Sequence, residues 1–452
     1  MPKKQLTLIP LIGIIYFTVS GGAFGLENVI SGAGPGLGLL LLIITPLMWS
    51  LPTTLVTAEM ATMLPLEGGY YRWVYFGMGR FWGFLEGWWT WLYTFVDMAI
   101  YPVTFSIYLK FFFPGMTWWQ QWLVNLLVIG SSLAINWRGA KSVGNSAVIA
   151  FVVVTAAFLL LTILAIPKMT HTPWHPFTPA EGKPLSETLG IGLTAVMWSY
   201  MGWDNVSTFA GEVKHPGRTF PLALLISVLL VTLLYVLPMT ATLSATTSWQ
   251  TWDSDNFTIS QVASQLVAPW LGALISFGVM WSNWSLFNSQ LLYTSRLPFA
   301  MAEDGLLPQA LTKTHPRFGT PVISLLVCAA IYSVFTLLSF KKLVVINVLI
   351  YTMSLLLEFA ALIRLRFTRP DLERPFKIPG GMPGVLMALF SLLLFALACI
   401  VFTITGEDDS WQQIILVIGL LLTGPLVYSI LKWRRNQPGE LSWLQALSTT
   451  EK

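Results

Sequence analysis

The chain has 452 residues, a length that suits roughly two to four soluble domains, but its composition excludes a soluble protein. Charged residues make up 10% of the sequence and hydrophobic residues 55%, whereas about 25% of the residues in soluble domains are charged. The net charge of +4 does not indicate nucleic acid binding, because basic residues in a membrane protein gather in its cytoplasmic loops. No cleavable leader is expected, since the first apolar run continues from Leu6 to about residue 30.

Apolar runs near the length of about 20 residues that crosses a bilayer recur along the chain and predict twelve membrane-spanning helices. The predicted spans are residues 7–30, 36–64, 82–109, 119–136, 143–166, 186–210, 221–244, 260–294, 321–339, 342–363, 384–404 and 411–431. The third and eighth are longer than a bilayer requires, so they are tilted or extend into loops. We therefore expect an all-α membrane protein with one polytopic domain over residues 1–452 and a short cytoplasmic tail at 432–452.

The basic residues orient this arrangement. With a cytoplasmic N-terminus, the inner segments hold 20 of the 25 lysines and arginines and the outer segments hold 5. This bias places both termini in the cytoplasm. We expect an integral protein of the cell (inner) membrane, and no oligomeric state is predicted.

Two predicted spans carry glycine in their interiors, where it does not stabilise a continuous helix. The first has three glycines in the run GGAFG at residues 21–25, and the sixth has Gly202 close to Asp204. The breaks are five spans apart, as expected if spans 1–5 (residues 7–166) and 6–10 (residues 186–363) form inverted repeats around a substrate site. Close helix packing is the alternative explanation for either glycine group alone.

An interrupted helix exposes backbone groups that hydrocarbon cannot satisfy, so each break must line a cavity or meet a ligand. We expect the N–H groups of Gly21, Gly22 and Ala23, at the start of a half-helix, to face an anionic group such as a carboxylate. Carbonyls near Val19, Trp198 and Ser199 can accept hydrogen bonds from an ammonium group. Together the breaks suit the two charged ends of an amino acid.

Carboxylates lie in the predicted spans without basic partners there. Because an ionised side chain at the bilayer centre costs at least about 2.5–3.5 kcal/mol, such acids must be protonated, solvated or neutralised by a cationic ligand. We expect Asp204, Glu27 and Asp97 to serve the site, although interhelical hydrogen bonding is an alternative for Asp97. For acids nearer the cytoplasmic ends, namely Glu59, Glu86 and Glu358, we expect contacts with loop arginines such as Arg72 and Arg80.

Further site candidates are aromatic or amide side chains. Trp198 and Trp203 flank the second break, where either could cover a substrate or make a cation–π contact, and Asn283 could bind solute or an ion, or bond to another helix. The complete set of predicted substrate-binding residues is Ser20, Gly21, Gly22, Ala23, Glu27, Asp97, Trp198, Ser199, Tyr200, Trp203, Asp204 and Asn283.

Features of enzymes and metal sites are not predicted. All four histidines fall in predicted loops, and no nucleophile–histidine pair or metal-ligand set lies in the spans. We expect no catalytic residue, metal or cofactor. Cys328 and Cys399 lie in apolar runs and are predicted to be packing residues.

Beside the breaks, several motifs resemble those of the amino acid–polyamine–organocation permeases. They are WSLPTTLVTAEMATMLPLEGGY (49–70), NWRG (136–139), GEVKHP (211–216) and SRLPFAMAEDGLLP (295–308). Within that superfamily, SGGAFGLE (20–27), DMAIYP (97–102) and WDNVST (203–208) look most like the polyamine-uptake branch, related to L-type amino acid carriers.

The resemblance implies a twelve-helix carrier with a LeuT-like arrangement of two inverted five-helix repeats, alternating access and commonly proton coupling. The family's Gly-Ser-Gly loop falls on Ser20, Gly21 and Gly22, its aromatic gate on Trp198 and its acidic position on Asp204. The order here is permuted to Ser-Gly-Gly, and residues 151–155 lack the lysine that helps some relatives couple protons. Asp204 or Glu27 is then expected to carry the proton.

These observations predict a secondary transporter of amino acids or polyamines. If polyamines are the substrates, replacing Glu27 with glutamine should impair the transport of polyamines more than the transport of neutral amino acids. Its partners are a small amine-bearing substrate, protons and the lipid bilayer. An amino acid exchanger is the main alternative, and a channel or a non-transporting solute sensor on the same scaffold is a second one.

Overall fold

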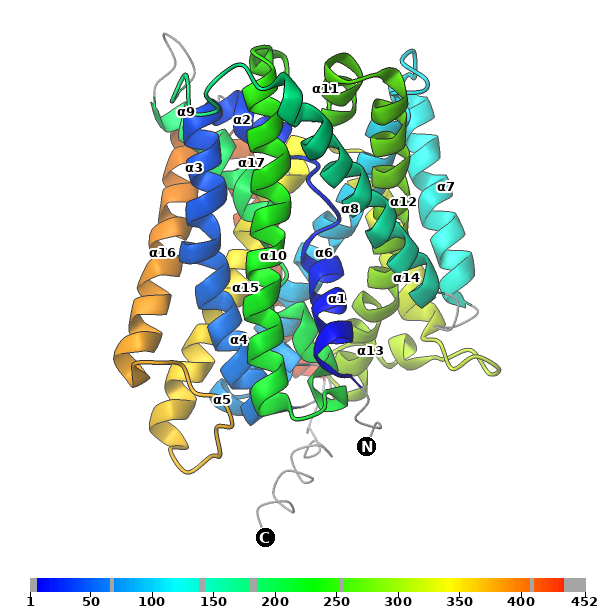
Figure 1. The fold of residues 1–452 in the computed structure, drawn as a ribbon. Coiled ribbons are helices and arrows are strands. Elements are labelled where there is room, and N and C mark those ends of the chain that lie inside the picture. The colour runs from blue at the N-terminus through cyan, green and yellow to red at the C-terminus, as the bar shows by residue number, and fades with distance from the viewer. Residues whose placement is uncertain are drawn as a thin grey trace.

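The computed structural model describes residues 6–65, 69–137, 143–178, 185–252, 255–406 and 410–434. Across these residues the chain is helical and contains no strand. The helices stand side by side as a bundle, with the short helices α2 and α11 at one end and α5 and α13 at the other (Figure 1).

The α-helices follow the chain in this order: α1 (Leu8–Val19), α2 (Glu27–Ala33), α3 (Pro35–Thr45), α4 (Leu51–Met63), α5 (Gly69–Met78), α6 (Arg80–Leu109), α7 (Trp118–Trp137), α8 (Val143–Ala165), α9 (Leu185–Ser199), α10 (Pro216–Ala245), α11 (Ile259–Leu266), α12 (Pro269–Thr294), α13 (Arg296–Glu303), α14 (Val322–Phe335), α15 (Phe340–Thr368), α16 (Gly381–Gly406) and α17 (Ser410–Arg434). The π-helical turn η1 (Pro46–Ser50) joins α3 to α4, and the 3-10 helix η4 (Asn205–Glu212) follows α9.

Within the described residues, seven continuous helical stretches are long and apolar enough to cross a bilayer. They run from Pro35 to Met63, Arg80 to Leu109, Ile149 to Lys168, Pro216 to Ala245, Phe340 to Thr368, Gly381 to Val401, and Trp411 to Leu431. Three shorter apolar helices accompany them, and two of these, Leu8–Val19 and Thr188–Ser199, are short because the chain unwinds directly after them. The chain is therefore an integral membrane protein.

The structure corrects one predicted span. Residues 260–294 do not form one long helix but two, because α11 ends at Leu266 and α12 begins at Pro269. Proline disfavours helical geometry in the residue before it and lacks the N–H that a continuing helix needs. The chain therefore turns at residues 267–268. The third span, in contrast, is the single 30-residue helix α6.

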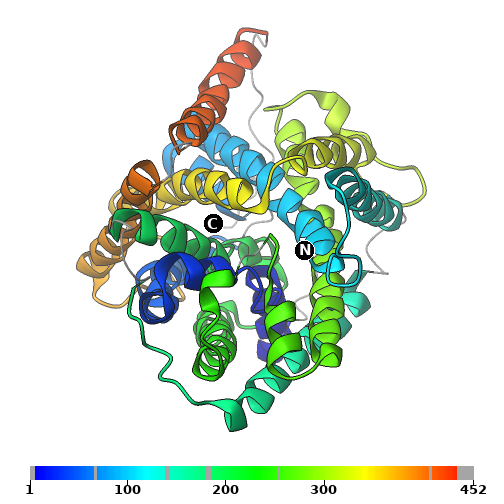
Figure 2. The ribbon, with the colours of Figure 1, turned by 90° about the horizontal axis from the view of Figure 1, so that it is seen from above.

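The centre of the bundle is formed by α6 and α15, which make the most extensive contact between two helices among the described elements. Seen along the bundle, α16 in orange and α17 in red lie at the periphery (Figure 2). Cys328 and Cys399 are buried, as predicted for packing residues. The inner helices α6 and α15 also bury polar side chains.

An ion pair between membrane helices fastens α4 to α15. The Glu59 carboxylate is completely buried and accepts hydrogen bonds from the Arg366 guanidinium, including one of 2.9 Å from Nε, and it lies 3.5 Å from Nε of Arg374. The backbone N–H of Ile378 donates to the same carboxylate at 2.8 Å. Glu59 thus pairs with arginines that follow the predicted span 342–363, as expected for a contact with loop arginines, although the partners are not the examples Arg72 and Arg80.

Replacing Glu59 with glutamine should destabilise the protein strongly. Removing one partner of a buried ion pair leaves the other charge uncompensated, which costs about 3–5 kcal/mol, and the Arg366 side chain is only 6% exposed. Thermal unfolding in detergent measures the loss. Glu303→Gln, at an exposed acid of α13, is the control, and equal stability of the two variants would contradict the prediction.

Candidate functional site

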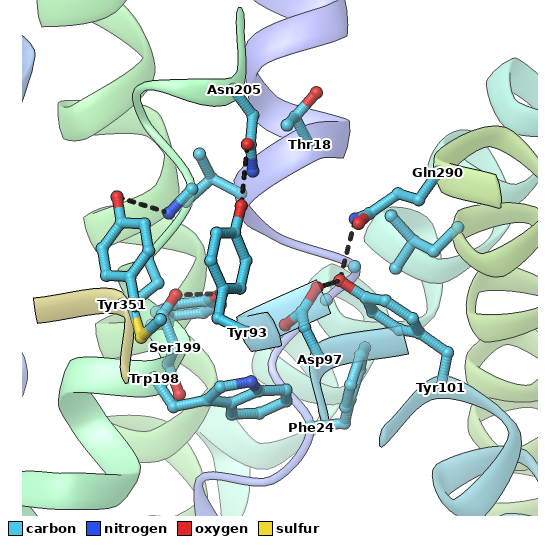
Figure 3. Close-up of a pocket in the computed structure, with 17 residues that line it drawn as sticks. Thr18, Phe24, Tyr93, Asp97, Tyr101, Trp198, Ser199, Asn205, Gln290 and Tyr351 are labelled. Carbon is cyan, nitrogen blue, oxygen red and sulfur yellow. Dashed lines mark hydrogen bonds between the residues drawn. The ribbon is translucent and has the colours of Figure 1, made fainter. Parts of the chain in front are cut away.

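The two interrupted helices meet at a cavity inside the bundle. After Val19 the chain leaves helical geometry and resumes it at Glu27, and after Ser199 it is non-helical until η4 begins at Asn205. Both breaks therefore lie where the sequence places them. The cavity is lined by Thr18, Val19, Gly21, Gly22, Phe24, Tyr93, Asp97, Tyr101, Trp198, Ser199, Met201, Gly202, Asn205, Tyr235, Leu286, Gln290 and Tyr351 (Figure 3).

Glycine is required where the two breaks approach each other. Gly25 has a φ of +77°, and a Cβ there would lie 3.1 Å from the Trp198 ring and 3.0 Å from the Phe340 ring. Gly202 has a φ of +91°, and a Cβ there would lie 3.5 Å from the carbonyl oxygen of Thr18. A larger residue would be strained at both positions. The glycines therefore let the unwound segments pack against each other.

Hydroxyl groups from other helices satisfy part of the unwound backbone. Ser282 on α12 donates to the carbonyl of Gly21 at 2.7 Å, and Tyr235 on α10 donates to the carbonyl of Ser199 at 3.0 Å. The N–H of Gly202 donates to the hydroxyl of Tyr351 at 3.3 Å. These hydrogen bonds stabilise the unwound segments, because hydrocarbon offers their backbone N–H and C=O groups no partner.

Asp97 on α6 is the acid that lines the cavity. Its carboxylate accepts hydrogen bonds from Tyr101 at 3.1 Å and from Asn347 at 2.9 Å, and Gln290 in turn donates to the Tyr101 hydroxyl at 2.8 Å. The indole of Trp198 points toward it (Figure 3). All of these donors are neutral, so they orient the carboxylate without cancelling its charge.

The walls around Asp97 are aromatic. Six rings line the cavity, those of Phe24, Tyr93, Tyr101, Trp198, Tyr235 and Tyr351. No lysine, arginine or histidine is found among the lining residues that the structure describes. Aromatic faces and a carboxylate both attract cations, so the cavity is built to receive a positively charged group.

Asp204 lies behind the cavity wall. It is 3% exposed and accepts a hydrogen bond from the Tyr351 hydroxyl, while Gly202, Asn205 and Tyr351 line the cavity around it. A substrate in the cavity therefore meets Tyr351 before it meets Asp204.

Glu27 does not line the cavity, in contrast to the prediction. Its Oε1 atom accepts hydrogen bonds from the backbone N–H of Ile259 at 2.7 Å and from the Tyr108 hydroxyl at 3.0 Å. Ile259 is the first residue of α11, so Glu27 joins α2 to the start of that short helix. Glu27 also lies in the first turn of α2, where the helix dipole favours an acidic side chain.

The half-helix geometry expected at the first break also differs. Because α2 begins only at Glu27, Gly21, Gly22 and Ala23 lie in the unwound segment and not in the first turn of a helix. Gly21 and Gly22 line the cavity, whereas Ala23 and Ser20 are buried outside its lining. The Ser20 hydroxyl accepts a hydrogen bond from the N–H of Gly22 at 3.3 Å and so shapes the break itself.

Three further predicted residues point elsewhere. The Tyr200 hydroxyl donates to the carbonyl of Leu42 at 2.9 Å, and the buried Trp203 indole donates to the carbonyl of Tyr200 at 2.8 Å. Asn283 donates to the carbonyl of Val279 in its own helix at 2.8 Å. Of the predicted residues, the cavity lining thus brings together Gly21, Gly22, Asp97, Trp198 and Ser199.

Sequence reasoning missed the tyrosines and amides that complete the cavity. Tyr93 donates to the side-chain oxygen of Asn205 at 2.9 Å, which joins α6 to η4. Tyr93 lies four residues before Asp97, and this helical spacing could have placed it on the same face of α6. Tyr351 and Gln290 come from distant spans and carry no comparable local signal.

Comparisons with known proteins agree with this picture. The model of a family described as amino acid permease matches residues 6–424. A probable polyamine transporter of Arabidopsis thaliana is 38% identical over 93% of this chain and 87% of its own length. A polyamine transporter of Oryza sativa subsp. japonica is 33% identical over 85% of this chain and 72% of its own, and a branched-chain amino acid permease of Bacillus subtilis is 27% identical over 88% and 85%.

Replacing Glu27 with alanine should loosen α11. The variant removes the acceptor at the helix start, a loss of about 0.5–2 kcal/mol for a capping interaction, so amides in residues 259–266 should exchange with deuterium up to about thirtyfold faster. Tyr108→Phe retains the bond to Ile259 and should change exchange less. Unchanged protection of α11 in the alanine variant would show that Glu27 does not anchor it.

Proposed function

The chain belongs to the amino acid permease family, and from this premise we propose that it is a secondary active transporter of amine-bearing solutes, with polyamines as the favoured substrates. The observation that carries the proposal is Asp97, a carboxylate in an aromatic cavity whose described lining holds no basic side chain. An ammonium group supplies the missing positive charge. The names of the plant relatives support the same substrate class.

Amino acids are the second candidate. The backbone of Gly21 and Gly22 lines the cavity, and unwound N–H groups suit a substrate carboxylate. The bacterial relative is named a branched-chain amino acid permease. Against this, the first turn of α2 already contains the protein's own acidic residue Glu27, so the start of this helix does not offer its N–H groups to a substrate carboxylate.

The proposed mechanism is alternating access, in which the cavity opens to one side of the membrane at a time. The cavity has a volume of about 40 Å³, room for only a few water molecules, so helices must separate to admit a substrate. We propose twelve spans in two inverted repeats, residues 7–166 and 186–363, followed by spans 384–404 and 411–431, with both termini cytoplasmic and the protein in the cell membrane. Proton coupling through Asp204 is proposed, and substrate exchange is the alternative mode.

Uptake into proteoliposomes tests the proposal. Radiolabelled putrescine, spermidine and leucine are offered in turn under an imposed pH gradient, and we expect accumulation of the polyamines above the level in protein-free vesicles. Accumulation of leucine alone would favour the amino acid candidate. If none of the three accumulates, and none of them exchanges with the same solute inside the vesicles, the proposal is contradicted.

Asp97→Asn should impair polyamine transport selectively. A hydrogen bond to a charged group contributes about 1.5–3 kcal/mol, so the KM for spermidine should rise about ten- to hundredfold while the side-chain shape is kept. Asn283→Ala is the matched control, because Asn283 lies outside the cavity lining. Equal KM values for Asp97→Asn and the unmodified protein would exclude Asp97 as the ammonium site.

A further inference from the structure

A line of polar side chains follows the contact between α6 and α15, from the cavity toward the end of the bundle that carries α5 and α13. The helices run antiparallel here, since Asp97 bonds to Asn347 at 2.9 Å, the Tyr93 and Tyr351 rings lie 5.3 Å apart, and Ser354 bonds to Glu86 at 2.6 Å. We call this line the α6–α15 seam; its members are Glu86, Thr90, Tyr93 and Asp97 on α6 and Asn347, Tyr351, Ser354 and Glu358 on α15.

The spacing along each helix explains the seam. Positions 86, 90, 93 and 97 on α6 are separated by three or four residues, and so are positions 347, 351, 354 and 358 on α15. Residues three and four apart occupy one face of a helix. Each helix thus turns a polar stripe toward the other, and the two stripes line the contact between α6 and α15 inside an apolar bundle.

Two acids at the far end of this seam have no counterion. Glu86 and Glu358 are 0% and 1% exposed, and neither forms an ion pair with a described lysine or arginine. The Oε1 atom of Glu86 accepts hydrogen bonds from Thr90 at 3.1 Å and Ser354 at 2.6 Å. The Oε2 atoms of both acids are buried without a hydrogen-bond partner. The arginine contacts predicted for them are therefore absent.

Such acids are stable only as neutral groups. An isolated carboxylate in a low-dielectric interior costs several kilocalories per mole, and a group in this position takes up a proton instead of remaining charged. The described groups that act electrostatically on Glu358 are Asp204 and Glu86, and both are acidic. We therefore expect Glu86 and Glu358 to be protonated at neutral pH, because no described lysine or arginine pairs with them.

The seam also reaches the substrate cavity. Tyr351 lines the cavity and donates its hydroxyl hydrogen to Asp204, while Tyr93 and Asp97 line the same cavity from α6. Glu86 and Glu358 do not line it, so they do not contact a substrate there. Any effect of these two glutamates on transport is therefore indirect.

We propose that the α6–α15 seam is a proton route, in which Glu86 and Glu358 store the proton that is exchanged with Asp204 during transport. This inference rests on the proposed function. One proton moves from the carboxyl group of Glu86 or Glu358 to the Asp204 carboxylate, so the donor becomes a carboxylate and Asp204 a neutral acid. The net charge of the seam is unchanged by the step. Both glutamates thus act on transport through Asp204, and neither binds the substrate.

Infrared spectroscopy tests the protonation without any transport. The purified protein should show the carbonyl stretch of protonated carboxylic acids at neutral pH. Glu86→Gln and Glu358→Gln should each remove part of that signal, and Glu303→Gln, at an exposed acid, should not. Glutamine resembles a protonated glutamate in shape and charge, so both variants should fold. An unchanged signal in both variants would overturn the proposal.

Transport then separates coupling from substrate movement. In proteoliposomes, the Glu86→Gln/Glu358→Gln double variant should lose at least about tenfold of its pH-gradient-driven spermidine accumulation, whereas exchange of internal for external spermidine without a gradient should persist. Glu303→Gln should retain both activities. Full gradient-driven accumulation by the double variant would overturn the proton route, and so would loss of exchange together with accumulation.

Failure of the proposed function has a different signature. If the unmodified protein moves no polyamine and no amino acid in either assay, the transporter proposal fails, while the infrared result still decides whether Glu86 and Glu358 hold protons. If the unmodified protein exchanges spermidine but does not accumulate it under a pH gradient, the proton route is overturned and the transporter proposal stands.

Discussion

An unwound backbone in hydrocarbon must find its hydrogen bonds inside the protein, and the rest of this structure depends on how that requirement is met. The breaks after Val19 and Ser199 lie against each other inside the bundle, and hydroxyl groups from α10, α12 and α15 bond to them. The helices that supply those groups therefore pack around the breaks. The cavity lies where they converge, and polar groups surround it there on several sides.

Much of this architecture is encoded locally. Hydropathy located the long spans, and the glycines at 21–25 and 202 located both breaks, because each is a property of one short stretch. The sequence predicts one helix where α11 and α12 are separate, because apolar residues lie on both sides of the turn before Pro269. It also predicts that Glu27 faces the cavity, one turn from a break, yet the direction of this side chain is set by Tyr108 and Ile259, distant partners that no local pattern reveals.

The few charges in the spans are used in four different ways. Glu59 is neutralised by arginines, Glu27 binds the start of α11, Asp97 faces the cavity, and Glu86 and Glu358 lie in the seam without counterions. The sequence shows each as an acid in an apolar run and cannot separate these environments. The distinction arises from whether a guanidinium, a helix start or an open space lies opposite, which is a property of packing between remote segments.

Tyrosine connects the cavity to the breaks. The rings of Tyr93, Tyr235 and Tyr351 line the cavity, and their hydroxyls bond to Asn205, to the carbonyl of Ser199 and to Asp204. All three of those acceptors lie in or beside the second break. A substrate that displaces one of these rings must therefore also disturb a hydrogen bond that stabilises the unwound segment. Because a lost bond in this interior is costly, occupancy of the cavity and the geometry of the interrupted helix are energetically linked, which is what a carrier needs in order to change its exposed side when loaded.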